Sequence, residues 1–349
     1  RKHGYEKGTK YEAWMYAPEF GMDAPTRISL ESHGKEKFTF RGKPAEGIKL
    51  VSTMHSKVGA VAIASWLDDE GKPLLVTMQM AGIPIEMLAT DRESAQAEFI
   101  PTDLFTQSLL TIKTEIPPGA KSVVYQLRPK KNKQLNLQPE KNDFQSVRPL
   151  EGGAVEVTVK RANHVALLKA KGHSAGLDIK YKKSNVMIDS DDPLVQRLSK
   201  RASRGARNVF DLAHRLRHFV SRYVRVKNLE VGFATASEVA RSREGDCSEH
   251  AVLLAAMGRA SGLPSRVVAG LVYVPKLEGK TNVMGYHLWT QFHLRGRWVD
   301  FDAALNESEC SPTRIALMAS PLEDSSLTEL GLVLLDYIGQ VEIKVTKVE

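Results

Sequence analysis

Three side chains in the C-terminal half of the 349-residue chain have the types needed for nucleophilic catalysis at a carbonyl: Cys247, His287 and Asp302. A cysteine attacks as its thiolate, and an ordinary thiol, with a pKa of about 8.5, is mostly protonated at neutral pH. A histidine that takes the thiol proton, held in one tautomer by a carboxylate, overcomes this limit. We therefore predict Cys247 as the nucleophile, His287 as its base and Asp302 as the group that orients the histidine.

The residues around Cys247 predict that its thiol lies at a helix N-terminus. Residues 251–260 are apolar and helix-forming, and the pattern stops at Gly262, as a helix exit does. On the other side, Gly245 permits a tight entry turn and Asp246 is a candidate N-cap that supports the site. A helix N-terminus favours negative charge and leaves backbone N–H groups without intrahelical acceptors. We therefore expect the Cys247 N–H to donate to a substrate oxyanion.

A predicted hairpin decides whether the histidine and the carboxylate can meet. Residues 286–294 and 297–302 alternate like strands and flank Arg295–Gly296, a hairpin turn signal. With two or four residues in the turn, paired positions sum to an odd number, and His287 shares a sheet face with Asp302. A three-residue loop would reverse the parity. A turn of two or four residues therefore predicts that the two side chains are neighbours.

These residues belong to blocks of sequence that occur in a fixed order, at 245–254, 259–268, 286–289 and 297–302. Together the blocks resemble the core signature of the transglutaminase-like superfamily, bacterial type, over residues 233–305. The resemblance implies a papain-like catalytic core that uses the triad named above. Two positions depart from the family pattern: Gln291 stands where many members have Glu, and Ala303 follows the acidic residue where Pro is usual. Neither change removes a triad member, so we expect activity to be retained.

Other candidate residues have weaker claims. His250 lies three residues after Cys247 on the same helix face and is an alternative base or metal ligand. Further ligands at suitable spacing are missing, so we expect no metal site and no other cofactor. Trp289 and Trp298 are expected to line or support the cleft. The second oxyanion donor is not assigned, although residues 228–233 offer candidates.

A helical region must precede the nucleophile and an antiparallel sheet must follow it. An Asp N-cap and a Pro at 192–193 announce the first helix. In the second helix, apolar residues recur at three- and four-residue spacing, as a core-facing stripe does. Helices are predicted over 193–202, 206–224 and 236–240, and a strand over 265–274.

The N-terminal half is predicted to be β-rich. Residues 61–67 and 74–80 flank a turn at 68–73 and form a predicted hairpin. Further strands are predicted at 123–127, 154–159 and 165–168, with a polar, lysine-rich loop at 129–147. We therefore expect an α+β protein with two domains: a β-rich domain at 1–189, whose role the sequence does not reveal, and a transglutaminase-like catalytic domain at 190–349.

Composition and charge are those of a globular protein. Hydrophobic residues make up 42% and charged residues 26%, and no apolar run reaches the roughly 18 residues of a membrane-spanning helix. The net charge of +8 favours acidic partners. Its densest parts are Lys130, Lys131 and Lys133 in a loop, and Lys200, Arg201, Arg204, Arg207, Arg215, Arg217 and Arg222 in a helical stretch. We interpret both as solvated surface and expect no nucleic-acid binding, because no recognition motif accompanies the charge.

The two cysteines and the first residue of the sequence bear on the cellular compartment of the protein. The two cysteines, Cys247 and Cys310, form neither a CxxC metal pattern nor a disulfide framework. A disulfide between them would consume the proposed nucleophile, so we expect two thiols, with Cys310 a bystander. The sequence starts at Arg1 rather than Met. A removed leader, and with it export to the periplasm or the cell exterior, therefore stays open.

A thiol core of this kind allows two reactions and one non-enzymatic alternative. A thioester on Cys247 is resolved by water in a hydrolase and by an amine in a transglutaminase. We favour hydrolysis of a peptide or protein substrate at its amide bonds, because water is always available whereas an amine site must be built. The alternative is a binding protein that keeps the fold without catalysis. A missing triad residue would have favoured it, and all three are present. The oligomeric state is not set by these patterns.

Overall fold

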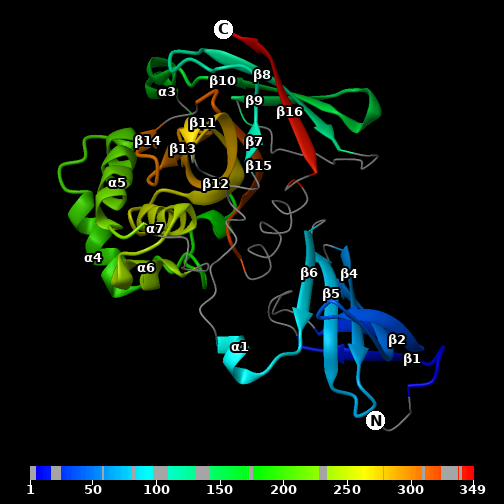
Figure 1. The fold of residues 1–349 in the computed structure, drawn as a ribbon. Helices are drawn as coiled ribbons and strands as arrows, with labels where there is room; N and C mark the ends of the chain where they lie inside the picture. The colour runs from blue at the N-terminus through cyan, green and yellow to red at the C-terminus, as the bar shows by residue number, and fades with distance from the viewer. Residues whose placement is uncertain are drawn as a thin grey trace. The chain divides into compact units, whose positions relative to one another are not determined.

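The computed structural model describes residues 5–16, 25–56, 59–80, 83–96, 109–130, 142, 144–170, 172, 176–227, 234–277, 279–308, 311–323, 337 and 340–349 (Figure 1). The chain is an α+β protein with a β-rich N-terminal region, as predicted. It divides into two compact units, the first mainly residues 1–103 and the second mainly 104–334 and 339–349. The sequence placed residues 104–189 with the first domain, but their contacts place them in the second compact unit. That 190–349 acts as the catalytic domain stays a prediction.

The first unit is an antiparallel sheet whose strands follow the chain order. They are β1 (Lys10–Met15), β2 (Thr26–Phe40), β3 (Lys43–Ser56), β4 (Gly59–Leu67), β5 (Pro73–Met80) and β6 (Ile83–Leu88), followed by helix α1 (Arg92–Gln96). The predicted hairpin is β4–β5. Its turn is closed by Asp68, whose Oδ1 accepts bonds of 2.9 and 2.8 Å from the backbone N–H groups of Glu70 and Lys72.

The second unit begins with a sheet that the C-terminal strand completes. Its members are β8 (Ser122–Pro129), β9 (Gln145–Pro149), β10 (Val155–Lys160) and β16 (Val341–Val348), in the order β16, β8, β10, β9, with a 3₁₀ turn η2 (Glu151–Gly153) before β10 and another, η3 (Ile179–Tyr181), further on. Gln145 joins this sheet to the next one, because its side chain both donates to and accepts from the backbone of Ala316 at 2.8 Å. Most of the predicted loop at 129–147 lies outside the described residues.

The strand predicted at 165–168 is wrong, because these residues lie in helix α3 (His164–Lys169). Asn163 caps this helix: its Oδ1 accepts a 3.0 Å bond from the backbone N–H of Ala166. A side-chain cap satisfies a donor that the first turn of a helix leaves free. This local bond outweighs the strand preference of a short apolar run.

The helices of the second unit follow the predicted order closely. They are α4 (Pro193–Ala202), α5 (Val209–Tyr223), α6 (Ala236–Ser242) and α7 (Cys247–Ala260). Asp192 caps α4 as predicted, with Pro193 as its first residue. Helix α5 starts three residues later than predicted, because Asn208 caps it by accepting from the N–H groups of Phe210 and Asp211, both at 3.0 Å.

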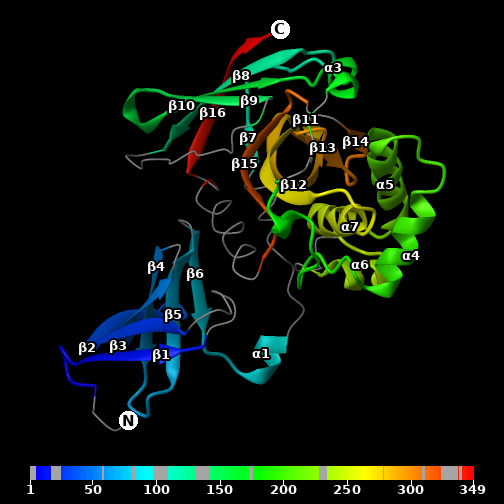
Figure 2. The ribbon, with the colours of Figure 1, turned by 180° about the vertical axis from the view of Figure 1, so that it is seen from behind.

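An antiparallel sheet whose strands differ in length packs against α7 and contains the predicted hairpin. Its strands are β11 (Ser265–Leu277), β12 (Lys280–Leu294), β13 (Arg297–Asp302), β14 (Glu307–Ser308) and β15 (Arg314–Ser320), in the order β14, β13, β12, β11, β15, with β7 (Leu110–Thr111) paired to β12. Gly258 of α7 allows close approach: a Cβ there would lie 2.1 Å from the ring of Phe292 on β12. Figures 1 and 2 show helices α4 to α7 gathered on one side of these strands, and the β8–β10 sheet with α3 on the other.

The core of the second unit surrounds α7, whose residues from Ser248 to Arg259 are all buried. A helix that is buried on every side is held in place by all of its neighbours. The start of α7, which carries Cys247, is therefore fixed relative to the sheet. Within the described part of the chain, no helix combines the length and apolar character needed to cross a membrane.

Candidate active site

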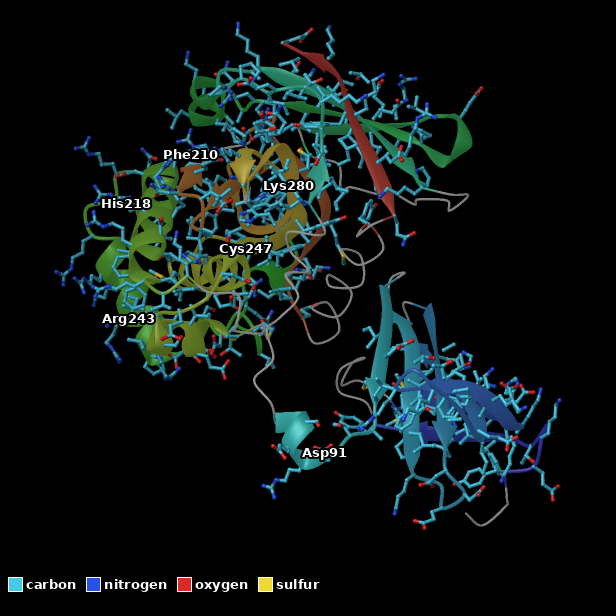
Figure 3. The ribbon with its side chains drawn as sticks, viewed as in Figure 1. Asp91, Phe210, His218, Arg243, Cys247 and Lys280 are labelled. Carbon is cyan, nitrogen blue, oxygen red and sulfur yellow. The ribbon has the colours of Figure 1, made fainter. Side chains whose placement is uncertain are left out.

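Cys247 is the first residue of α7, and the residues next to it build the helix N-terminus (Figure 3). Asp246 is the N-cap: its Oδ1 accepts bonds from the backbone N–H of Ser248 at 2.8 Å and from the Ser248 hydroxyl at 2.6 Å. Gly245 enters this turn with φ at 140°, a conformation that favours glycine. The half-buried Cys247 side chain thus starts a rigid helix, and its own N–H has no intrahelical acceptor.

Glu249 completes the cap and was not identified from the sequence. Its Oε2 accepts a 2.9 Å bond from the backbone N–H of Asp246, which makes a reciprocal capping box, and its Oε1 accepts from Ala234 N–H at 3.2 Å. Burial, followed by the side-chain contact with Asp246, raises the pKa of Glu249. The signal was readable, since an acidic residue three positions after an Asp N-cap is typical of a capping box.

The hairpin of β12 and β13 places His287 beside Asp302. Leu294 pairs with Arg297 across a two-residue turn at Arg295–Gly296, which gives the odd-sum register considered above. His287 Nε2 lies 2.6 Å from Asp302 Oδ2. The two side chains are 7% and 2% exposed, so the contact is shielded from water.

Asp302 has a second buried partner, Arg314 of β15. The Nη1 of Arg314 lies 2.7 Å from Asp302 Oδ2, and its Nη2 lies 2.6 Å from Glu307 Oε2. The other carboxylate oxygen, Oδ1, accepts a 2.9 Å bond from Leu305 N–H. Asp302 is thus held from three directions. Arg314 was missed from the sequence because it lies outside the recognised blocks, and nothing in its neighbours predicts a bond to the site.

The electrostatics of the pair favour its charged form. Burial alone would lower the pKa of His287, but the Asp302 carboxylate and the Cys247 side chain, both within hydrogen-bond reach, together raise it to about 9. Burial alone would raise the pKa of Asp302, but His287 and Arg314 hold it well below its usual range. His287 therefore carries a proton at neutral pH beside an ionised Asp302.

This shift predicts how stability depends on pH. The folded pKa of His287 is about 9 and its ordinary value is 6.5, so its stabilising contribution is complete below pH 6.5 and is lost as the pH rises through about 9. Urea unfolding of wild type and His287→Gln should differ most below pH 6.5 and converge at alkaline pH. His250→Gln is the control. Burial lowers the pKa of His250. The stability of wild type relative to His250→Gln should therefore fall, rather than rise, as the pH drops below 6.5. A pH-independent difference for His287→Gln would contradict the prediction.

A second polar network lies beside the first and involves Trp289 and Gln291. Asp300 Oδ1 accepts from Trp289 Nε1 at 2.9 Å and from Gln291 Nε2 at 2.7 Å, while Gln291 Oε1 accepts from Arg266 Nε at 2.7 Å. Gln291 both donates and accepts here. A Glu at this position would meet the Asp300 carboxylate with like charge, whereas the Gln291 amide donates to it.

The two tryptophans take different places. The buried Trp289 ring stacks on His287, with centroids 6.3 Å apart and planes at 19°, and Arg314 lies 5.5 Å from its centroid. Trp298 instead packs on Arg266, whose guanidinium carbon is 4.2 Å from its ring centre, and contacts His293 and Tyr181. Trp289 therefore contacts the predicted base, while Trp298 contacts the neighbouring network.

Of the remaining candidates, the structure describes His250. His250 Nδ1 bonds to the carbonyl of Asp246 at 2.6 Å, so this histidine belongs to the first turn of α7. Among the described residues, no group of three or more His, Cys, Asp or Glu side chains is arranged to hold a metal. Cys310 and the oxyanion candidates at 228–233 lie outside the described residues.

Comparison with known proteins finds one matching family model and several solved structures with a similar fold. The model of the transglutaminase-like superfamily matches residues 196–303. Among solved structures, a candidate cysteine protease from Cytophaga hutchinsonii is similar at 15% identity and a TM-score of 0.40, covering 66% of this chain and 89% of its own. The periplasmic domain of TgpA from Pseudomonas aeruginosa is similar at 14% identity and a TM-score of 0.35, covering 57% and 75%. No curated protein matches the chain.

Proposed function

We propose that this chain hydrolyses peptide or amide bonds through a thioester on Cys247, as the match of residues 196–303 to the model of the transglutaminase-like superfamily suggests. The observation that supports this most directly is the buried 2.6 Å contact between His287 and Asp302, with the Cys247 side chain within hydrogen-bond reach of the same imidazole. A nucleophile, a base and an orienting carboxylate in this order are what covalent acyl transfer requires.

The proposed reaction uses the two ring nitrogens of His287 differently. Nε2 faces Asp302, so Nδ1 is the nitrogen that holds the proton given up by the Cys247 thiol in the thiolate–imidazolium pair. The thiolate then adds to the substrate carbonyl carbon, and the resulting oxyanion accepts a bond from the Cys247 N–H. When the C–N bond breaks, the departing amine takes the proton from Nδ1 and the thioester remains. Water then attacks the thioester while giving a proton to Nδ1, and the C–S bond breaks to release the acid product and restore the Cys247 thiolate beside the protonated His287.

His287 contributes more than the helix to stabilising the thiolate in this scheme. A helix N-terminus favours an anion by a partial positive charge. Here, however, Asp246 and the buried Glu249 sit at the same terminus and accept its free N–H groups. The imidazolium beside Asp302 is the nearby full positive charge, so loss of His287 should affect the reactivity of Cys247 strongly.

The test is the rate of iodoacetamide labelling of Cys247 as a function of pH, in wild type and in His287→Ala. We expect fast labelling below pH 7 in wild type, because the thiolate is paired with an imidazolium. In His287→Ala, fast labelling should require a pH near about 8.5, where an ordinary thiol ionises. Peptide mapping by mass spectrometry separates Cys247 from Cys310, which serves as the internal reference.

The same experiment distinguishes the non-enzymatic alternative. If both cysteines label alike in wild type and the profile does not change in His287→Ala, Cys247 is not activated and the binding-protein alternative is preferred. If Cys247 is activated, turnover of fluorogenic peptides with and without an added primary amine then separates hydrolysis from amine transfer. Release of product without amine supports the hydrolase.

A further inference from the structure

A basic groove lies on the helical side of the second unit, formed where α4, α5 and α6 end. Its volume is about 630 Å³, and five arginines line it: Arg201, Arg215, Arg222, Arg225 and Arg243. They come from the last turn of α4, from α5 and the residues after it, and from the C-cap of α6. In Figure 3, the groove residues His218 and Arg243 lie at the outer edge of the helical layer, away from Cys247.

Most of these arginines have no ion-pair partner among the described residues. Arg215 is paired with Asp211 at 3.0 Å. Within the described ranges, the side chains of the other four form no ion pair. Like charges around one groove repel each other and lower the stability of the empty protein. The arrangement therefore has an electrostatic cost that a bound anion would remove.

Two of the guanidinium groups are held in place by an aromatic pair on α5. Phe219 and Tyr223 stack with centroids 5.4 Å apart and planes at 17°. Arg201 lies 5.9 Å from the Phe219 ring centre and Arg243 lies 4.8 Å from that of Tyr223. The Tyr223 hydroxyl is fixed by a 2.8 Å bond to the carbonyl of Ala240. Because these two guanidinium groups are already ordered in the free protein, binding a ligand costs less side-chain conformational entropy.

The helix ends explain only part of the charge. Arg201, Arg222 and Arg243 lie at the C-termini of α4, α5 and α6, and a helix C-terminus carries about half a negative charge that a nearby cation offsets. Even with these three termini and Asp211 counted, the groove keeps a surplus of about two and a half positive charges. A solvated helix face, the interpretation from the sequence, does not account for arginines that converge from three elements.

We propose that this groove binds an anion that carries two or more phosphate groups. A guanidinium presents a planar fork that pairs with phosphate oxygens through two hydrogen bonds. A phosphate group carries about −1.5 to −2 charges, against −1 for a carboxylate, so two phosphates offset most of the net side-chain charge that the five arginines and Asp211 leave in the groove. That volume lies in the range of small-ligand sites, about 300 to 1,000 Å³. The ligand is either a soluble diphosphate or the headgroup of a diphosphate lipid.

The experiment measures pyrophosphate binding by calorimetry and, in parallel, co-sedimentation with phosphatidylcholine vesicles with and without cardiolipin. The test variants are Arg222→Glu and Arg243→Ala. The control is Arg197→Glu, which has the same charge change as Arg222→Glu on an exposed residue of α4 outside the groove. We expect each groove variant to weaken binding at least about tenfold, because a charge-assisted bond is lost, and Arg197→Glu to bind like wild type. Thermal melting curves verify that each variant is folded.

The pattern of binding separates the sources. Pyrophosphate binding that only the groove variants weaken supports a soluble ligand. Cardiolipin-dependent sedimentation with the same variant pattern, and no pyrophosphate binding, supports a lipid headgroup. No binding to either probe, or equal weakening in Arg197→Glu, overturns the proposal. Cys247 labelling is independent of the groove, so failure here leaves the proposed catalytic function untouched.

Discussion

Replacing Asp302 with Asn is expected to lower peptide hydrolysis by on the order of 10⁴-fold, the loss typical when a triad carboxylate becomes an amide. Oδ2 of Asp302 accepts from both His287 and Arg314, and Oδ1 accepts from Leu305 N–H. Either orientation of an amide therefore points its NH₂ group at a donor. Without the carboxylate, burial lowers the pKa of His287, so labelling of Cys247 below pH 7 should also slow. Turnover and iodoacetamide labelling of the folded variant test both results.

Asp300→Asn is the matched control. Asp300 lies two residues earlier on β13, is also buried and also loses one negative charge, but its bonds go to Trp289 and Gln291. We expect this variant to keep fast labelling of Cys247 at neutral pH. If Asp300→Asn and Asp302→Asn slow labelling equally, the effect reflects general loss of buried charge, and the assigned role of Asp302 is wrong.

Local sequence signals accounted for the elements that carry the site. The apolar run after Cys247, its Asp cap and the glycine that ends the run predicted α7, because each is a short-range feature of helix geometry. The two-residue turn at Arg295–Gly296 set the hairpin register, because side chains alternate strictly along a strand. The contact of His287 with Asp302 follows from that register and needs no information from distant parts of the chain.

Features that depend on distant residues were not predictable in this way. Strand β15 reaches the site only because it pairs with β11, so the bond from Arg314 to Asp302 has no local signal. The basic groove likewise depends on three helix ends that converge only in the fold. Helix α3 is a different case: its Asn163 cap was readable, but a six-residue apolar helix has the same composition as a buried strand.

Arg314→Met is expected to lower the free energy of unfolding by about 3 to 5 kcal/mol, the cost of leaving one member of a buried ion pair without its partner. Arg314 and Asp302 are each 2% exposed, so water cannot replace the lost bond. The other partner, Glu307, is 52% exposed and is solvated without the arginine. Urea unfolding at neutral pH measures the loss. Glu307→Gln is the control and should change stability by no more than about 1 kcal/mol.

A double-mutant cycle then tests whether Arg314 acts through Asp302. In an Asp302→Asn background the buried charge that Arg314 compensates is already gone, so Arg314→Met should cost much less there than in wild type. Labelling of Cys247 gives a readout that a purely structural role would not change. In Arg314→Met, the Asp302 carboxylate loses a charged partner that lowers its pKa and fixes its orientation. It then stabilises the His287 imidazolium less, and fast labelling of Cys247 should shift to higher pH. Arg314→Lys keeps the positive charge and should restore much of this shift, because the charge rather than the fork holds Asp302 ionised. Additive stability costs, together with an unchanged labelling profile, would mean that Arg314 only packs against Trp289 and does not position the carboxylate.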